Sequence, residues 1–205
     1  MSGLEAHQRA VAAEKRAAIL EAGRRLFGAR GYERVSVGQV AKEASVSLAT
    51  LYKHFESKEV LFEAILAERC DAFVCALTAA DVPRGDPEAS LMAYAESYAR
   101  GLASPATAET LRLLIGEAPA FPQLAATFFA RLEGPVQGPL REHLRPLPAA
   151  RHLRFDHEQR ALRELLGMLE GGVLWRMLLQ RDAVDADHVQ DVARSAVTTW
   201  LARYG

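Results

Sequence analysis

Residues 36–59 read SVGQVAKEASVSLATLYKHFESKE, and this stretch decides our interpretation of the fold. Two short segments with helical spacing lie on either side of a tight break at residues 44–46, and another helical pattern opens at Ser57. Ser36 opens an S-x-x-Q capping box, which starts a helix, and Ser47 can cap the next helix. This pattern is typical of a helix-turn-helix, whose second helix enters the major groove of DNA.

Helical spacing continues through the rest of the chain. Apolar residues from Ile19 to Phe27 recur at helical intervals, and residues 28–31 end that helix with two glycines. Further helical stretches are separated by proline-containing breaks at residues 83–87, 104–105, 121–122 and 146–148. No stretch shows sustained strand alternation. We therefore predict an all-α fold, with a three-helix head over residues 13–73 and a larger helical body over residues 80–205.

Within the body, the last two helices are the most regular, and they are predicted over residues 157–180 and 185–203. The stretch from residue 122 to about residue 144 contains two Gly-Pro pairs, at 134–135 and 138–139. Because proline removes a helical hydrogen bond and crowds the preceding turn, we expect a kink there.

Charge is distributed unevenly along the chain. The formal net charge is -1, but residues 1–55 carry nine Lys or Arg and five Asp or Glu, which gives this part +4 and leaves -5 for the remainder. A basic head on an acidic body suits a protein that presents one end to phosphates.

Several other classes of protein fit the sequence poorly. Half of the residues are hydrophobic and a quarter are charged, which argues against disorder. No stretch approaches ~18 apolar residues, so we expect no membrane span. The first 16 residues lack the apolar core of a signal peptide, and we therefore expect a cytoplasmic protein.

The sequence also lacks the patterns of metal sites and enzymes. Cys70 and Cys75 are five residues apart in one predicted helix and point in different directions, so we interpret them as packing residues. The histidines form no ligand spacing, and the phosphate-binding, dinucleotide-binding and nucleophile-elbow motifs are missing. We predict no metal, no cofactor and no catalytic residue, and hence no enzyme.

In the second helix of the motif, Leu51 and Phe55 would face the core, which leaves the other side for DNA. Small side chains there allow close approach to bases, whereas hydroxyl, imidazole and ammonium groups can bind phosphates. Serines at helix starts lie where backbone N–H groups also favour phosphate. The predicted DNA-contact residues are Ser36, Ser47, Leu48, Ala49, Thr50, Tyr52, Lys53, His54 and Lys58.

The segment from Lys15 to Phe73 resembles the DNA-binding domain of the TetR family of transcriptional regulators, with a helix-turn-helix head like that of AcrR. The resemblance rests on FGARGY at 27–32, SVGQVA at 36–41, Val46-Ser47 and TLYKHFESKE at 50–59. It implies a homodimer with a DNA-binding head and a ligand-sensing, dimerising body. It also implies that phosphates are contacted by Tyr52, His54 and Lys58, and that the residues nearest the bases are Leu48, Ala49 and Thr50.

The chain departs from the family pattern at one turn position. Ser45 stands where the family usually has glycine. If Ser45 adopts positive φ, the strain is roughly 1 kcal/mol, which a packed domain can carry. Farther along, LRLLIGEAPAFPQL at 111–124 resembles the C-terminal part of a subgroup of the same family.

The penultimate helix is apolar over much of its circumference, so it must be covered on two sides. One cover would be the body core and the other a second subunit, which would give a four-helix bundle. Glycines in this helix fit close helix approach, although they could also mark a kink or break near residue 171. The predicted dimer residues are Leu166, Gly167, Gly171, Val189, Val197 and Trp200.

The family resemblance also implies a ligand pocket between body helices. Candidate lining residues are aromatic or apolar, so they predict a small lipophilic effector, although each one alone is more often a core residue than a pocket residue. They are Tyr94, Tyr98, Phe128, Phe129, His143, Met168 and Trp175.

These observations lead to one main hypothesis and three alternatives. The main hypothesis is a homodimeric repressor that binds a palindromic double-stranded DNA operator and is released by a small lipophilic effector. The alternatives are a DNA-binding factor without a sensor, an activator, and an enzyme with a helical active site.

Overall fold

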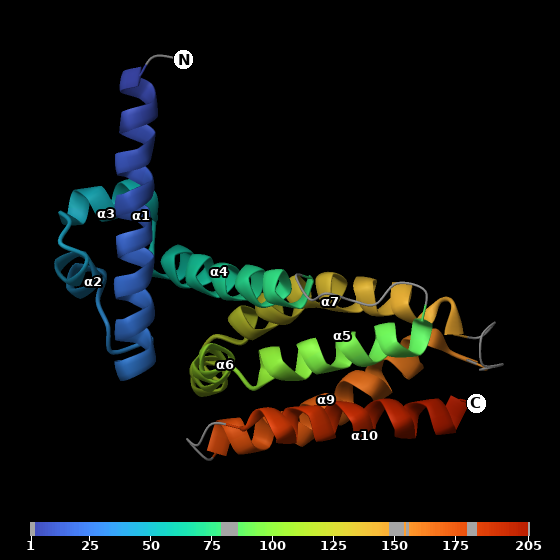
Figure 1. The fold of residues 1–205 in the computed structure, drawn as a ribbon. Coiled ribbons are helices and arrows are strands. Elements are labelled where there is room, and N and C mark those ends of the chain that lie inside the picture. The colour runs from blue at the N-terminus through green and yellow to red at the C-terminus, as the bar shows by residue number, and fades with distance from the viewer. Residues whose placement is uncertain (1–2, 79–85, 148–153, 155, 180–183, 205) are drawn as a thin grey trace. The chain divides into compact units, whose positions relative to one another are not determined.

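The computed structural model describes residues 3–78, 86–147, 154, 156–179 and 184–204, and most of these residues are helical (Figure 1). In chain order the helices are α1 (Gly3–Arg30), α2 (Val37–Glu43), α3 (Leu48–His54), α4 (Lys58–Thr78), α5 (Pro87–Leu102), α6 (Pro105–Glu117), α7 (Pro122–Leu144), α9 (Glu158–Leu179) and α10 (Ala186–Tyr204). The predicted all-α fold is confirmed for the described residues, and none of their helices is long and apolar enough to cross a membrane.

The chain forms two compact units. The head unit contains Met1–Arg69 together with Leu113–Ala126, and the body unit contains Cys70–Arg112 and Thr127–Gly205. Helices α4, α6 and α7 therefore each begin in one unit and end in the other. The sequence-based division placed residues 113–126 in the body, whereas the structure groups them with the head.

Serine side chains begin the helices of the head as predicted. The Ser36 hydroxyl accepts a hydrogen bond from the Gln39 amide at 3.2 Å, and the Gln39 side chain accepts one from the Ser36 amide at 2.8 Å. Ser47 and Ser57 each accept from the amide three residues on, at 3.1 and 3.2 Å. These bonds satisfy amides that have no partner within the helix, so local chemistry sets where each helix starts.

Two turns of the head require unusual backbone angles. Gly31 ends α1 with φ +82°, and its amide bonds the Phe27 carbonyl at 2.8 Å. Ser45, in the turn between α2 and α3, has φ +54°. The condition considered from the sequence, a positive φ at Ser45, is thus met, and this serine carries the strain that glycine would avoid.

The head core is built by aromatic and aliphatic side chains from segments far apart in sequence. The Tyr32 ring packs against Phe27 and Phe62, with ring centroids 5.5 and 4.8 Å away, and against Phe121 at 5.0 Å in an edge-to-face arrangement. Leu51 of α3 is fully buried. Because α1, α2 and α3 pack against one another, this core holds the helix-turn-helix together.

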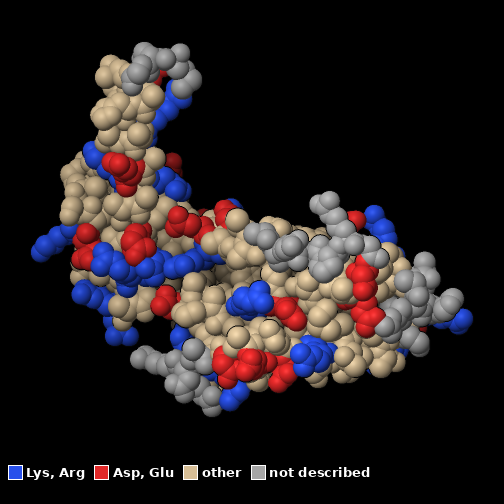
Figure 2. All heavy atoms as spheres, in the orientation of Figure 1, with Lys and Arg blue, Asp and Glu red and all other residues tan. Residues whose placement is uncertain are grey.

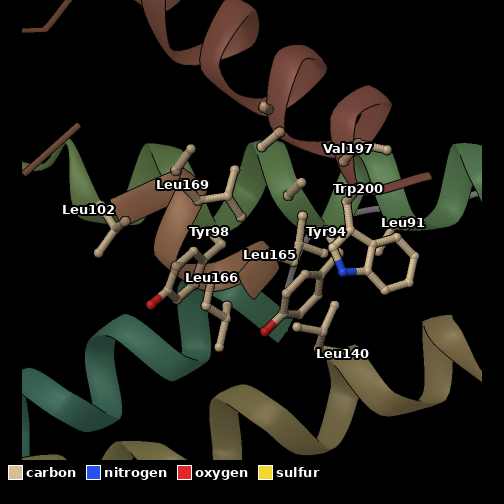
Figure 3. Packing of buried hydrophobic residues seen from close by; sticks show 14 of the residues in the cluster. Leu91, Tyr94, Tyr98, Leu102, Leu140, Leu165, Leu166, Leu169, Val197 and Trp200 are labelled. Atoms are coloured by element: carbon tan, nitrogen blue, oxygen red, sulfur yellow. The ribbon is translucent and has the colours of Figure 1, made fainter. Parts of the chain in front are cut away.

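The body core is formed where α5, α9 and α10 pack together (Figure 3). Trp200 is fully buried, and its indole N–H donates to the Ala161 carbonyl at 2.8 Å. The Tyr94 hydroxyl donates to the Val136 carbonyl of α7 at 2.5 Å. Each large ring thus buries its apolar part while its polar atom keeps a hydrogen bond, which avoids the cost of an unpaired buried donor.

The long body helices agree with the sequence to within about a residue. Helices α9 and α10 span 158–179 and 186–204, against predicted ranges of 157–180 and 185–203. Helix α7 is one helix that includes Pro135 and Pro139. The kink expected at these prolines stays a prediction.

We predict that Ser45→Gly raises the free energy of unfolding by about 0.5–1 kcal/mol, because glycine adopts positive φ without a steric penalty. Urea titration followed by circular dichroism measures the change. Ser45→Ala serves as the control, since it removes the hydroxyl but keeps the Cβ, and it should give no stabilisation. Equal stability of the glycine and alanine variants would show that the turn is unstrained.

Candidate nucleic-acid interface

Helix α3 is the second helix of the helix-turn-helix, and its two sides differ in exposure. Leu51 and the C-cap residue Phe55 are buried, and they fix α3 to the rest of the head. Tyr52 is 48% exposed and Leu48 is 46% exposed, although both carry large apolar groups. Exposed large side chains on a firmly packed helix are what a groove-binding surface requires. The exposed positions of α3 are Leu48, Ala49, Tyr52 and Lys53.

The remaining predicted contacts of α3 are half-buried or take part in local bonds. Thr50 and His54 are partly buried. The hydroxyls of Ser47 and Thr50 lie 2.8 Å apart and bond each other, while Ser47 also accepts from the Thr50 amide. These two hydroxyls thus stabilise the start of α3, and Ala49 offers the smallest exposed side chain for close approach to a base edge.

Two predicted phosphate contacts lie outside α3. The Ser36 hydroxyl caps α2, as described above. The Lys58 ammonium donates to the Glu33 carbonyl at 3.3 Å and lies over the Tyr32 ring, 4.2 Å from its centroid. Lys58 thus holds the turn between α1 and α2 in the free protein, a role that its sequence position did not predict.

Charged groups around the helix-turn-helix are only partly paired with one another. Arg25 of α1 forms an ion pair with Glu43 of α2 at 3.0 Å. The Arg16 guanidinium lies over the Phe55 ring, 5.3 Å from its centroid, so α1 brings a positive charge beside the end of α3. Figure 2 shows Lys and Arg side chains interspersed with Asp and Glu on the face in view.

The candidate effector residues fall into two groups. Tyr94, Tyr98 and Phe128 are buried, and His143 and Met168 are partly buried. Phe129 and Trp175 are 62% and 66% exposed, so within the single chain these two side chains lie on the surface and cannot line an enclosed cavity.

The structure brings three of the buried or partly buried candidates together. The Tyr94 ring stacks on Tyr98 with centroids 6.4 Å apart and lies 5.3 Å from the His143 ring. His143 Nδ1 lies 2.6 Å from the Ser90 hydroxyl, and the Tyr98 hydroxyl donates to Glu170 at 2.8 Å. No sequence pattern pointed to Ser90 or Glu170, because each is recognised only through its partner elsewhere in the body.

Burial sets the ionisation of this cluster. Burial is the main cause that raises the pKa of Tyr94 and of Tyr98 well above the ordinary tyrosine value. Burial likewise lowers the pKa of His143 below its usual 6.5, which keeps the imidazole neutral at pH 7. The three rings are thus uncharged near neutral pH.

Four predicted dimer residues are already covered by their own subunit. Their side chains belong to the body core and are buried within the single chain, and their place in a dimer interface stays a prediction: Leu166, Val189, Val197 and Trp200. Gly167 and Gly171 are exposed, and a Cβ on either would meet no atom of the chain within 4 Å. A Cβ on Gly172, by contrast, would lie 2.6 Å from Val192, so only this neighbouring glycine is required by packing within the chain.

Among the described residues, no group of three or more His, Cys, Asp and Glu side chains could hold a metal ion. The only ligand chemistry that the exposed face of α3 offers is a mixture of small, hydroxyl and cationic side chains. Such a mixture suits the grooves and phosphates of a nucleic acid.

Two family comparisons cover most of the chain. Residues 89–205 match the family described as AefR-like transcriptional repressor, C-terminal domain. Residues 19–65 match the family described as bacterial regulatory proteins, tetR family. Helix-turn-helix-type transcriptional regulators of Staphylococcus aureus, in strains USA300 and N315, are 35% identical to the chain over 63 residues. This match covers 31% of the chain and about a third (34%) of the length of these curated relatives.

Solved structures resemble the chain over nearly its whole length. A transcriptional regulator from Mesorhizobium loti, assigned to the TetR family, has a TM-score of 0.76 at 23% identity and covers 95% of this chain and 98% of its own. The flavonoid-responsive regulator FrrA has a TM-score of 0.76 at 26% identity, with 92% and 96% covered. The regulator PfmR from Thermus thermophilus has a TM-score of 0.60 at 27% identity, with 90% and 97% covered. The fold is thus shared by these regulators.

We predict that Lys53→Gln weakens binding to DNA duplexes to a similar degree whatever their sequence, because a lysine at this exposed position would contact phosphate. The slope of log affinity against log salt concentration should fall by about one. Fluorescence anisotropy over a series of KCl concentrations measures both effects.

Arg160→Gln is the matched control for this experiment, since it removes one exposed positive charge from α9 of the body unit. It should leave the salt slope unchanged. A slope that is the same in both variants would place Lys53 outside the DNA contact.

Proposed function

The chain belongs to the TetR family of transcriptional regulators, with an AefR-like C-terminal domain, and from this premise we propose that it is a homodimeric repressor released from a palindromic operator by a small lipophilic effector. The observation that carries the proposal is the geometry of α3. Leu51 and Phe55 fix this helix to the head core, while Ala49, Tyr52 and Lys53 point away from it into solvent.

Recognition of a palindrome follows from a dimer with one α3 per subunit. Two recognition helices spaced by one turn of DNA, about 34–36 Å, would enter successive major grooves on one face of the duplex. Ala49 and Leu48 would lie nearest the base edges, while Tyr52 and Lys53 would contact the flanking phosphates. Most of these contacts would orient the head, and only the few beside the bases would select sequence.

The exposed side of α9 supports the dimer. Trp175 and Leu179 are 66% and 77% exposed, which is unusual for large apolar side chains. Gly171 lies about one turn and Gly167 about two turns before Trp175, so all three share one side of the helix. Open glycine surface beside an exposed tryptophan would let a second α9 approach closely and cover the aromatic ring.

The uncharged cluster of Tyr94, Tyr98 and His143 supports a lipophilic effector. Its rings would offer an apolar ligand large stacking surfaces and few polar groups. FrrA, whose fold is similar, is by name responsive to flavonoids, which are aromatic molecules. The effector must bind the DNA-free arrangement better than the DNA-bound one, because only a difference in affinity between two states can release the operator.

We predict that the dimer binds a duplex taken from upstream of its own gene with two subunits per site, and that Tyr52→Ala weakens this binding ~10-fold or more, as expected when a hydrogen bond to a charged group is lost. Fluorescence anisotropy with sedimentation velocity gives affinity and stoichiometry. Tyr52→Phe keeps the ring and removes only the hydroxyl, so it measures the contribution of the hydroxyl alone. Wild-type binding that is indifferent to sequence would favour the factor without a sensor.

We predict that Trp175→Ala raises the dimer dissociation constant ~30-fold, which is the effect of losing a central aromatic anchor. Sedimentation equilibrium measures the constant. Phe129→Ala is the control, since it removes an equally exposed aromatic ring from α7. A dimer that is unaffected by Trp175→Ala would exclude this side of α9 as the interface.

A further inference from the structure

One carboxylate from helix α6 holds the turn that leads into the helix-turn-helix. Glu117 is the last residue of α6, and its Oε1 accepts a hydrogen bond from the Tyr32 amide at 2.8 Å, across 85 residues of sequence. Gly31, at φ +82°, makes room for this approach, because a Cβ there would lie 3.2 Å from the same oxygen. A carboxylate that accepts from a backbone amide is a strong, charge-assisted bond.

The same turn is held from its other side by a cation. The Lys58 ammonium bonds the Glu33 carbonyl and lies over the Tyr32 ring, while Glu117 binds the amide of Tyr32. The negative group thus meets an N–H and the positive group meets a C=O, so each charge has the sign that its backbone partner favours. The Tyr32 ring itself is 2% exposed and cannot leave the core without breaking both contacts.

The turn determines where the recognition elements begin. Only three residues separate Glu33 from Val37, the first residue of α2, and the intervening Ser36 is its N-cap. Helix α2 packs against α3, so a change in the direction of this turn alters the position of α3. Lys58, a predicted phosphate contact, would also lose its present partners if the turn moved.

Helix α6 is fixed at a second point, five residues before Glu117. The Arg112 side chain donates from Nε to the Leu178 carbonyl at 3.1 Å and from Nη2 to the Met177 carbonyl. These carbonyls lie in the last turn of α9, where free acceptors and the helix dipole favour a positive charge. Arg112 and α9 both belong to the body unit, so this contact fixes the part of α6 that lies in that unit.

We propose that Glu117 is a positioning residue of the DNA-binding head: its carboxylate, by accepting the Tyr32 amide, sets the turn between α1 and α2 and thereby the operator affinity. The effect on the operator rests on the proposed function, whereas the effect on the turn does not. The interaction requires an acceptor oxygen at this place, and the negative charge adds to its strength.

Two substitutions separate these requirements. Glu117→Gln removes the charge but keeps a carbonyl oxygen of the same reach, and Glu117→Ala removes the acceptor. Glu68→Ala, on the exposed side of α4, is the control for loss of a carboxylate from the head unit. Thermal unfolding of each variant checks that the fold is intact.

The first measurement is hydrogen–deuterium exchange of the full chain, read in a peptide that covers residues 28–36. Exchange of the Tyr32 amide should accelerate on the order of tenfold in Glu117→Ala, because its acceptor is lost. It should stay close to wild type in Glu117→Gln and Glu68→Ala. This measurement needs no DNA, so it decides the effect on the turn even if the protein binds no operator.

The second measurement is anisotropy titration of the upstream duplex. Glu117→Ala should weaken binding ~10-fold, and Glu117→Gln should remain within about threefold of wild type. Unchanged exchange and unchanged affinity in Glu117→Ala would overturn the proposal. Equal losses in the glutamine and alanine variants would also overturn it, because charge and not the acceptor would then matter. If wild type binds no duplex, the proposed function fails, while exchange at Tyr32 still supports or refutes the role of Glu117.

Discussion

The packing of the Tyr32 ring against Phe27, Phe62 and Phe121 is the constraint on which the head depends. These rings come from the end of α1, the start of α4 and the segment after α6, so a single cluster joins three distant parts of the chain. This cluster sets the direction of the turn after α1, and that turn determines the positions of α2 and α3. Aromatic pairs at these distances contribute beyond their buried area, and the Tyr32–Phe121 pair has the favourable edge-to-face geometry.

In the body, the polar atoms of the large buried rings donate hydrogen bonds to neighbouring helices. Trp200 and Tyr94 donate to backbone carbonyls of α9 and α7, and Tyr98 donates to a carboxylate. Each bond links two helices, so the rings that fill the core also define how the helices are positioned along one another.

The sequence was most informative where local chemistry decides structure. The serine caps and the glycine at the end of α1 were predictable, because each depends on residues within four positions. The positive φ of Ser45 was considered only because the related family usually has glycine there. Contacts across the fold were not predictable. Glu117 is an ordinary helix-terminal glutamate until α6 is placed beside Tyr32. Helical periodicity likewise marks Trp200 and Trp175 as similar apolar residues, yet one is fully buried and the other is 66% exposed.

The continuity of α4, α6 and α7 across both units limits how such a protein can be recombined. A segment that ends at Arg69 carries the whole helix-turn-helix but lacks residues 113–126, and hence Phe121 and Glu117. Grafted onto another body, it would leave one edge of the Tyr32 ring open and the Tyr32 amide without its acceptor. Chimeric regulators built from this chain must therefore exchange two stretches of sequence together. Gene fusion at a single junction would lose the contacts of Phe121 and Glu117 with Tyr32.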